Sequence, residues 1–297
     1  MILVAGSANV DFVVRVPHIP APGETVLGSG FKTFPGGKGA NQAVACARAG
    51  GADTALLLAL GEDSFAATLE AALRSAGVRL HIVRAIGKPT GAAFICVSDD
   101  AENAITVAPG ANGSLLESHL PPLNGVTHLL MQLETPMNTV TAYARAAKAS
   151  GVKVVLNAAP ARELAPELLA LIDVLVVNQG ELATISAHSG DLASSLERND
   201  IPCVIVTLGE RGCCARVDGE TVLQDSFAVV PVDTTAAGDT FCGVLVAALG
   251  DDVSLREALR RSSAAAALAC TRLGAQSSIP THAEVEMFLK QRAGATQ

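Results

Sequence analysis

The chain has 297 residues, 49% of them hydrophobic, which suits one large α/β domain or two modest ones. Lys and Arg total 21 against 29 Asp and Glu, so the net charge is −8, and the chain contains no tryptophan and one tyrosine. Because it lacks both a basic excess and an aromatic stacking platform, we expect no nucleic-acid partner. No apolar run reaches membrane-spanning length, so we expect no membrane partner either.

The cysteines and the first residues indicate the compartment. The seven cysteines are an odd number without a C-x-x-C pair, and most lie in apolar runs. The start of the chain, residues 1–6, lacks the basic region of a signal peptide and resembles a strand. We therefore expect reduced thiols, no zinc site and a cytoplasmic location.

Short apolar runs alternate with helical patterns along the chain. The candidate strands are 2–5, 54–60, 127–133, 152–157, 174–178 and 202–207, with helical stretches at 40–49, 64–75, 137–150 and 179–189. The strands are continuous Val, Leu and Ile runs, which is typical of a parallel sheet covered on both faces. The alternation predicts a doubly wound α/β fold.

Two segments, 12–34 and 91–108, interrupt this alternation. The first contains extended pieces and a turn at 20–23, and the second has the pattern of a hairpin with a polar turn at 99–103. These short strands can form a small sheet that covers a cleft as a lid, although two surface hairpins without a role are the alternative. After helical patterns at 240–249, 255–272 and 283–292 the chain ends, with no repeat or linker. We predict one domain, residues 1–297, that carries the lid.

The stretch 233–239 follows a strand-like run at 227–232 and opens a long apolar helix. Its small residues Ala236, Ala237 and Gly238 allow a tight turn that uncovers main-chain N–H groups at a helix N-terminus, which favours anions. A carboxylate at this point, Asp239, would repel a phosphate unless it accepts a proton. The combination indicates phosphoryl transfer, with Asp239 as base beside an anion hole. A helix-capping Asp is the alternative.

The glycine-rich stretch 35–42 opens the first long helix. Its glycines allow the backbone to approach a ligand, and Lys38 and Asn41 carry donors suited to sugar hydroxyls. It is not a Walker loop, which needs a different spacing and a final Ser or Thr, nor a dinucleotide fingerprint, whose last glycine would fall on Gln42. A glycine-rich turn without a ligand is the alternative.

Polar residues follow several of the predicted strands. They are Asn9 and Asp11 after the first, Glu134 after the third, Asn178 and Glu181 after the fifth, and the loop 207–212 after the sixth. Ligands bind beyond the carboxyl ends of parallel strands, so we expect these residues to meet in one cleft. The Asn178 and Glu181 pair can orient waters around Mg²⁺. The alternatives are turn formation for Asp11, helix capping for Asn178 and Glu181, and a plain hairpin turn for the loop 207–212.

Together, these stretches resemble the ribokinase-like (PfkB-type) carbohydrate kinases over essentially the whole chain. The matching residues are 9–11, 22–25, 36–42, 131–134, 178 with 181, 207–212, 233–239 and 274–276. The stretches 36–42 and 233–239 look like the two signatures of this family. They are more similar to those of its ribose-phosphorylating members than to those of fructokinase, phosphofructokinase or adenosine kinase.

The resemblance implies a fold and an activity. The fold would be a three-layer α/β sandwich with a mostly parallel central sheet, helices on both faces and a small β-sheet lid. The activity would be ATP-dependent phosphorylation of the 5-hydroxyl of D-ribose, with Mg²⁺ accompanying ATP. A kinase of another small sugar, such as 2-deoxyribose or fructose, and a non-catalytic sugar- or nucleotide-binding regulator are the alternatives.

The resemblance also implies the site residues. Asp239 would be the base, with Ala236, Ala237 and Gly238 as the anion hole. The sugar would contact Asn9, Asp11, Gly37, Lys38, Gly39, Ala40, Asn41, Glu134 and Asp239. ATP would contact Asn178, Thr207, Leu208, Gly209, Glu210, Arg211, Gly212, Gly238, Asp239 and Ser263, the last of which stands where relatives often carry Asn or His.

Two further expectations follow from the resemblance, one for cations and one for assembly. Glu181 would position Mg²⁺ through water. K⁺ would lie beside the anion hole at Asp233, Thr235, Ala269, Arg272, Gly274 and Ser278, several of which would act through backbone carbonyls. The lid would cover the sugar and pair two subunits as a homodimer.

Overall fold

A nine-stranded sheet forms the middle layer of this computed structural model, whose described residues are 1–100, 102–186 and 201–294. Its strands are β1 (Ile2–Ala5), β4 (Thr54–Leu60), β5 (Arg79–Arg84), β8 (His128–Met131), β9 (Lys153–Asn157), β10 (Val174–Asn178), β11 (Cys203–Thr207), β12 (Cys213–Val217) and β13 (Glu220–Gln224). The order is β13-β12-β11-β10-β9-β8-β1-β4-β5, parallel from β5 to β11 and antiparallel beyond. The strand order reverses at β1, which places a ligand crevice beyond its carboxyl end.

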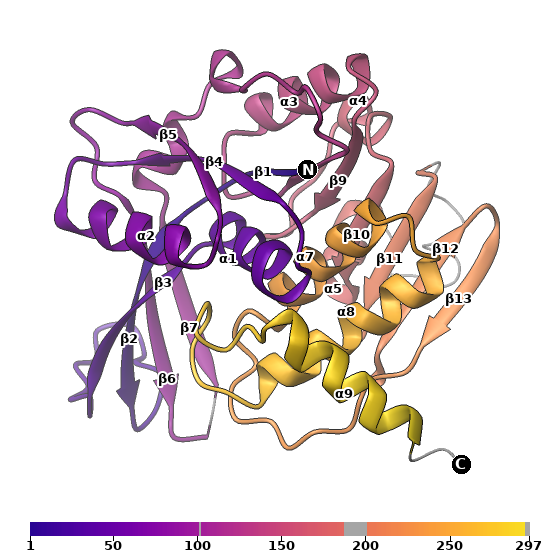
Figure 1. Cartoon of the computed structure of the whole chain (residues 1–297). Coiled ribbons are helices and arrows are strands. Elements are labelled where there is room, and N and C mark those ends of the chain that lie inside the picture. Colours follow the sequence, from indigo (N-terminus) through magenta and orange to yellow (C-terminus); the bar gives the residue numbers. More distant parts are fainter. Residues whose placement is uncertain (101, 187–200, 295–297) are drawn as a thin grey trace.

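Helices cover both faces of the sheet (Figure 1). One face carries α1 (Lys38–Val44), η1 (Ala45–Ala49), α2 (Ser64–Ser75), α7 (Ala237–Gly250), α8 (Leu255–Cys270) and α9 (His282–Gly294); the other carries α3 (Met137–Ala149), α4 (Pro166–Leu169) and α5 (Gln179–Ser186). Alternate strand residues enter the two cores: Ile2 and Val4 face the first, Leu3 and Ala5 the second. The predicted three-layer α/β sandwich is confirmed.

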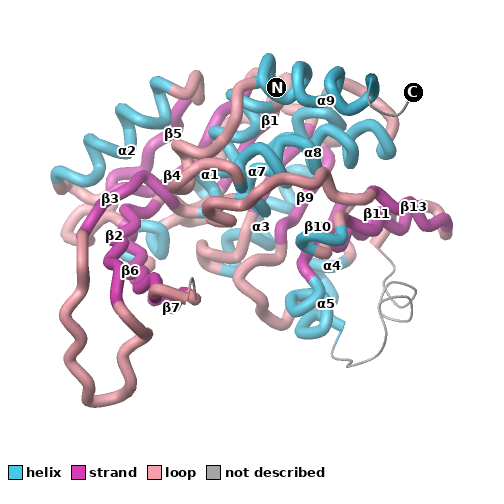
Figure 2. The backbone as a smooth tube through the Cα atoms, turned by 90° about the horizontal axis from the view of Figure 1, so that it is seen from below, coloured by secondary structure: helices cyan, strands magenta, loops and turns pink. Residues whose placement is uncertain are grey.

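A second sheet of four strands stands apart from the body. It consists of β2 (Asn9–Val16), β3 (Phe31–Gly36), β6 (Gly91–Ser98) and β7 (Asn103–Ala108), in the order β3-β2-β6-β7. The sheet projects from one end of the molecule, and the connection between β2 and β3 extends furthest from the body (Figure 2). The two segments predicted to form a lid therefore do pair with each other, through parallel β2 and β6.

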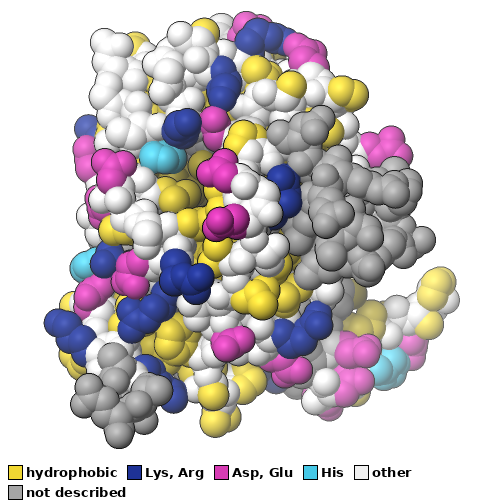
Figure 3. All heavy atoms as spheres, turned by 90° about the vertical axis from the view of Figure 1, so that its right-hand side faces the viewer, with side chains coloured by type: hydrophobic (Ala, Val, Ile, Leu, Met, Phe, Trp, Pro, Cys, Tyr) yellow, Lys and Arg dark blue, Asp and Glu magenta, His cyan; other side chains and the backbone are white. Residues whose placement is uncertain are grey.

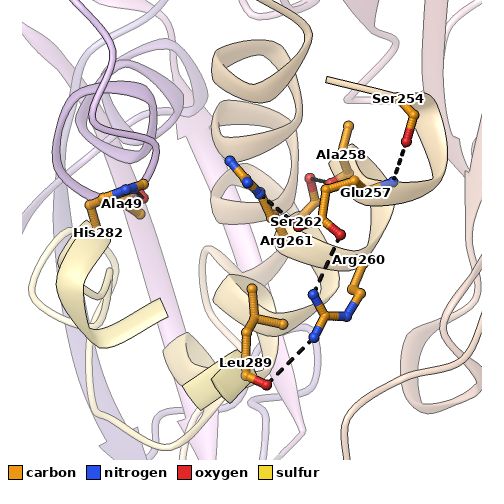
Figure 4. Close-up of polar contacts among 9 residues, drawn as sticks. All are labelled: Ala49, Ser254, Glu257, Ala258, Arg260, Arg261, Ser262, His282 and Leu289. Carbon is orange, nitrogen blue, oxygen red and sulfur yellow. Dashed lines mark hydrogen bonds and ion pairs between the residues drawn. The ribbon is translucent and has the colours of Figure 1, made fainter. Parts of the chain in front are cut away.

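The C-terminal helices α8 and α9 are tied to each other and to η1 by polar contacts (Figure 4). Arg260 on α8 donates to the carbonyl of Leu289 on α9 at 3.5 Å. The Nδ1 of His282, at the start of α9, lies 3.1 Å from the carbonyl of Ala49 in η1. These contacts fix the outer helices against the helix that follows the glycine-rich stretch.

The predicted elements agree with the structure where strands are buried on both faces, and β4, β10 and α2 have the predicted bounds. The strand expected at 227–232 is wrong: these residues form neither strand nor helix, and Val230 is 83% exposed, so no sheet buries this apolar run. The edge strand β5 was missed because charged residues interrupt its apolar pattern. The helix expected at 179–189 runs to Ser186, and 187–189 lie outside the described residues.

The described part of the chain contains no helix that is both long and apolar enough to cross a bilayer. All seven cysteines are free thiols, as expected.

Candidate active site

The glycine-rich stretch packs directly against the chain that leaves β1. Gly37, the N-cap of α1, has φ of 89°, and a Cβ on it would lie 2.7 Å from the nitrogen of Asn9. A Cβ on Gly39 would lie 2.6 Å from the carbonyl carbon of Gly6. Side chains at either position would separate α1 from β1. The glycines therefore bring Lys38 and the first turn of α1 to the carboxyl end of β1.

The helix α7 begins in the same region with a strained turn. Ala236 precedes it with φ of 60°, a left-handed conformation that costs a residue with a side chain about 1–2 kcal/mol. The N–H of Ala237 donates to the carbonyl of Thr234 at 3.2 Å, so this donor of the predicted anion hole is already engaged. Gly238 lies in the first helical turn, where N–H groups lack helical partners and favour anions.

Asp239 is buried, 8% exposed, and both of its carboxylate oxygens accept hydrogen bonds. Asn41 Nδ2 donates to Oδ2 at 2.9 Å, and Gln42 Nε2 donates to Oδ1 at 2.8 Å. Neutral amides hold this carboxylate without neutralising its charge, so it remains able to accept a proton. The two signature stretches thus meet at Asp239.

Polar contacts also link the ends of β1 and β8. Glu134 Oε2 accepts from Ser7 Oγ at 2.5 Å and from the N–H of Lys38 at 3.2 Å. Asn112 Nδ2 donates to Asn9 Oδ1 at 2.7 Å, and Asn112 Oδ1 accepts from the N–H of Ala8 at 3.0 Å. Glu134 and Asn9, two of the side chains predicted to hold the sugar, are therefore held in place by neighbours.

Asp11 and Lys38 have pKa values that reflect the crowding of carboxylates here. Burial, followed by repulsion from Glu134 and Asp239, raises the pKa of Asp11 to about 7. Burial lowers the pKa of Lys38, but the nearby carboxylates, Asp239 first among them, raise it more, and the net shift is upward. Lys38 is therefore a cation at neutral pH, placed among acids and able to meet an incoming phosphate.

A cavity of about 150 Å³ connects the proposed base to the ends of three further strands. Its lining residues are Lys38, Asn157, Ala159, Val176, Val177, Asn178, Glu181, Thr207, Ala236, Gly238, Asp239 and Cys242. The base, the anion-binding turn and the residues predicted to hold ATP at β10 and β11 thus share one space. Ser263 does not line it; it is buried on α8, with its Oγ 3.9 Å from Cys213 Sγ.

Asn178 and Glu181 cap the start of α5 reciprocally. Asn178 Oδ1 accepts from the N–H of Glu181 at 2.8 Å, and Glu181 Oε2 accepts from the N–H of Asn178 at 2.8 Å. This is the capping box that the sequence offered as an alternative. The pair also lines the cavity, and burial raises the pKa of Glu181.

The loop after β11 forms a tight turn, η4 (Gly209–Arg211), that leads into β12. Leu208 donates its N–H to the carbonyl of Gly212 at 2.8 Å. Gly212 has φ of 88°, and a Cβ there would lie 2.0 Å from the carbonyl oxygen of Gln224, so only glycine fits. The guanidinium Nη2 of Arg211 donates to Gln179 Oε1 at 2.7 Å, which holds Arg211 beside α5.

Three of the positions predicted to hold a monovalent cation, Asp233, Thr235 and Gly274, are in contact at the loop before α7 and the turn after α8. Asp233 Oδ1 accepts from the N–H of Thr235 and Oδ2 from the N–H of Gly274, both at 2.9 Å. Burial raises the pKa of Asp233, but these hydrogen bonds outweigh it and the pKa is lowered. The described residues contain no group of three or more His, Cys, Asp or Glu side chains suited to a metal. This does not conflict with K⁺ coordination, in which several of the predicted ligands are backbone carbonyls.

A larger cavity, about 360 Å³, lies between β3, α2 and the loop at Gln276. The charged residue in its lining is Arg48, and no carboxylate faces it. It has no candidate base, so the smaller cavity at Asp239 is the better candidate for the active site.

Sequence reasoning missed several polar residues of the site. Ser7, Asn112 and Asn157 were not singled out, and Gln42 and Gln132 were quoted within matching stretches without a role. Asn157 ends the buried strand β9 as Asn178 ends β10, so the strand-end rule that found Asn178 would have found it as well.

A buried carboxylate, a helix N-terminus and a lysine lie around one cavity. Together they are suited to moving a phosphoryl group to a hydroxyl, since they can take up a proton and balance phosphate charge. On a doubly wound α/β fold with a projecting sheet, they define a phosphotransferase.

The chain belongs to the pfkB family: the model of the "pfkB family carbohydrate kinase" matches residues 1–282. It is 42% identical to a ribokinase of Haemophilus influenzae over 299 residues, with 97% of each chain covered. The crystal structure of a ribokinase from Thermotoga maritima superposes with a TM-score of 0.89 at 36% identity, covering 97% of this chain and 99% of that one.

A structure of Arabidopsis thaliana ribokinase complexed with ribose and ATP superposes with a TM-score of 0.88 at 32% identity, covering 97% of this chain and 98% of that one. The family resemblance read from the two signatures is therefore confirmed, and with it the assignment as an ATP-dependent carbohydrate kinase.

Proposed function

We propose that this protein transfers the γ-phosphoryl group of ATP to the 5-hydroxyl of D-ribose. The observation that carries the proposal is the carboxylate of Asp239, buried and held by two amides at the cavity that contains Lys38 and Gly238. The relatives named as ribokinases, one of them complexed with ribose and ATP, support ribose as the sugar.

In this proposal Asp239 accepts the proton of the attacking hydroxyl, help that is typically worth about 10²–10⁴-fold in rate. Gly238 and Ala236 at the start of α7 receive the developing phosphate charge, whereas Ala237 must give up its bond to Thr234 to join them. Loss of one such donor typically costs about 3 kcal/mol of barrier.

The sugar would lie between the end of β1 and α1. Asn9, Asp11 and Glu134 would accept or donate hydrogen bonds to its hydroxyls, together with Lys38, Asn41 and the backbone of Gly37, Gly39 and Ala40. The side-chain oxygen of Asn41 supports this placement, because it is buried without a hydrogen-bond partner among the described residues. An acceptor left in this way is available to a substrate hydroxyl.

ATP would extend from Asp239 toward β10 and β11. Its contacts would be Asn178, Thr207, Leu208, Gly209, Glu210, Arg211, Gly212 and Gly238, and movement around α8 would be needed for Ser263 to contribute. Mg²⁺ would supply neutralisation of phosphate charge, with Glu181 holding its waters through the carboxylate oxygen that does not cap α5.

We further propose K⁺ as an activator at Asp233, Thr235, Ala269, Arg272, Gly274 and Ser278. The donor set fits a large monovalent cation, since it offers one carboxylate and several carbonyls. Asp233 already ties the loop before α7 to the turn at Gly274, so charge bound here would fix the orientation of that loop.

The lid is also the proposed site of homodimer formation. Phe31 and Phe94, which pack against Phe12 on one face, are 64% and 54% exposed, and Ile105 on the other face is 56% exposed. Exposed apolar residues clustered on one small sheet are typical of an interface. By contrast, the described part of the face in Figure 3 mixes acidic, basic and apolar side chains. The net charge of −8 does not favour a nucleic-acid partner.

The free cysteines support placing the protein in a reducing compartment, the cytoplasm.

ATP consumption measured across pentoses and hexoses tests the proposed function, with Asp239→Asn as the matched inactive variant. We expect D-ribose to give the highest kcat/KM and Asp239→Asn to bind sugar and ATP while losing at least about 100-fold in kcat. Turnover only of a hexose or 2-deoxyribose would refute the choice of ribose. Binding without turnover in the native protein would favour the regulator instead.

A further inference from the structure

We propose that Gln42 is a positioning residue that holds the carboxylate of Asp239 in its reactive orientation, and that Asn157 fixes the orientation of Gln42. The inference rests on the function proposed above, because it concerns the same base. Gln42 is 0% exposed and does not line the cavity, so it acts on the reaction only through Asp239.

Every polar atom of the Gln42 amide is used. Its Nε2 donates to Asp239 Oδ1 at 2.8 Å and to Asn157 Oδ1 at 2.9 Å. Its Oε1 accepts from Gln132 Nε2 at 2.6 Å. An amide nitrogen has two hydrogens, and both are committed here, so the group has one satisfied orientation.

The direction of this chain of amides is set by the backbone of the central sheet. Asn157 Nδ2 donates to the carbonyl of Val176 in β10 at 3.1 Å. Because a carbonyl only accepts, the nitrogen of Asn157 must face Val176 and its oxygen must face Gln42. The nitrogen of Gln42 must then face Asn157 and Asp239, since the reverse would place oxygen against oxygen.

The consequence for the base is a fixed carboxylate plane and a stabilised charge. Gln42 holds Oδ1 while Asn41 holds Oδ2, so the carboxylate cannot rotate about χ2 without breaking both bonds. Without Gln42, Oδ1 would lose its donor and the base would be less well aligned with an attacking hydroxyl.

The network leaves the Oε1 of Gln132 buried without a partner among the described residues. Such an atom destabilises the fold, since buried polar groups are nearly always paired. The amide of Gln132 is therefore oriented to donate to Gln42 although its own oxygen is left unpaired.

The test is the comparison of kcat with sugar KM for Gln42→Leu and Asn157→Leu, measured with whichever sugar the native protein phosphorylates. For Gln42→Leu we expect kcat to fall about 10- to 100-fold and sugar KM to change less than about threefold. Asn157→Leu should lower kcat by a smaller factor, because Gln42 remains but is no longer held by Asn157.

Thr139→Val is the matched control. It removes the buried hydrogen bond that Thr139, in α3, donates to the carbonyl of Leu115, away from the site, so it should lower stability and leave both kcat and sugar KM unchanged. If Gln42→Leu fails to fold, Gln42→Glu preserves the size of the side chain. Its carboxylate cannot donate to Asp239 Oδ1 as the amide does, so kcat should fall while sugar KM changes little.

A native kcat in folded Gln42→Leu or Gln42→Glu, or a sugar KM that rises as much as kcat falls, would overturn the positioning role. So would a loss of activity that only follows the fraction of folded protein. A native protein inactive on every sugar would instead refute the proposed kinase function, and the two failures are therefore distinct.

Discussion

The crossing of α1 and α7 at Gly243 offers a severe test of how the base is positioned. A Cβ on Gly243 would lie 2.5 Å from Ala45 Cβ and 2.6 Å from the carbonyl oxygen of Gln42. Carbon atoms in contact are normally about 3.5–4.0 Å apart, so Gly243→Ala must separate the helices by about 1 Å. Asp239 lies one turn before this contact, and its 2.8 Å bond to Gln42 spans the same two helices.

A displacement of about 1 Å can cost about 100-fold in rate, and we expect kcat of Gly243→Ala to fall by that order. Overpacking should cost about 1–3 kcal/mol of stability, offset by about 1 kcal/mol because alanine favours a helix over glycine. ATP consumption and urea unfolding measure the two effects. Gly113→Ala, at a position with no atom within 4 Å of the added Cβ, is the control. Native kcat in folded Gly243→Ala would refute the argument that close helix packing positions Asp239.

Three further predictions concern the sugar site, the cation and the lid. Because the pKa of Asp11 is raised to about 7, first by burial, sugar KM should rise as the pH falls below that value, and Asp11→Asn should remove the dependence. The folded chain holds this proton more tightly than the unfolded chain. Asp11 therefore stabilises the fold at low pH, and this contribution is lost as the pH rises from 3.8 to about 7. Urea unfolding of the native protein and of Asp11→Asn over that range measures the sign of this change in stability. Replacing K⁺ by Na⁺ should lower kcat in the native protein but not in Asp233→Asn, and equal native rates in the two salts would contradict the cation proposal. Phe94→Lys should convert a dimer into a monomer in light scattering with the fold retained, and an unchanged mass would exclude this face of the lid.

Much of the fold follows from the sequence because its central strands are buried on both faces. A strand such as β4 must be apolar at every position, and this leaves a continuous run that is easily recognised. The same rule failed for 227–232, where an apolar run is not covered by a sheet, and for β5, whose edge position tolerates charge. An apolar run therefore predicts a strand reliably only where the strand is buried on both faces of a sheet.

The candidate residues at strand ends were predictable because parallel strands place their carboxyl ends along one edge. The partners of those residues were not. Gln42 and Asn157 are 115 positions apart in sequence, and their contact depends on the register that sets Asn157 opposite Val176. A single sequence shows where an amide side chain lies in the chain but not which group it contacts. Residues that influence the reaction only through another residue therefore cannot be predicted from the sequence alone.

Gly39 and Gly243 explain why two amides of α1 can reach the carboxylate of Asp239. At its first turn, α1 touches the chain after β1 through Gly39, and at its end it touches α7 through Gly243. Asn41 and Gln42 lie between these two contacts, and their bonds to Asp239 therefore span a helix that is held on both sides. A side chain at either glycine would lengthen both bonds together without altering any polar residue. The reactivity of Asp239 consequently depends on the absence of two side chains as much as on the presence of two amides.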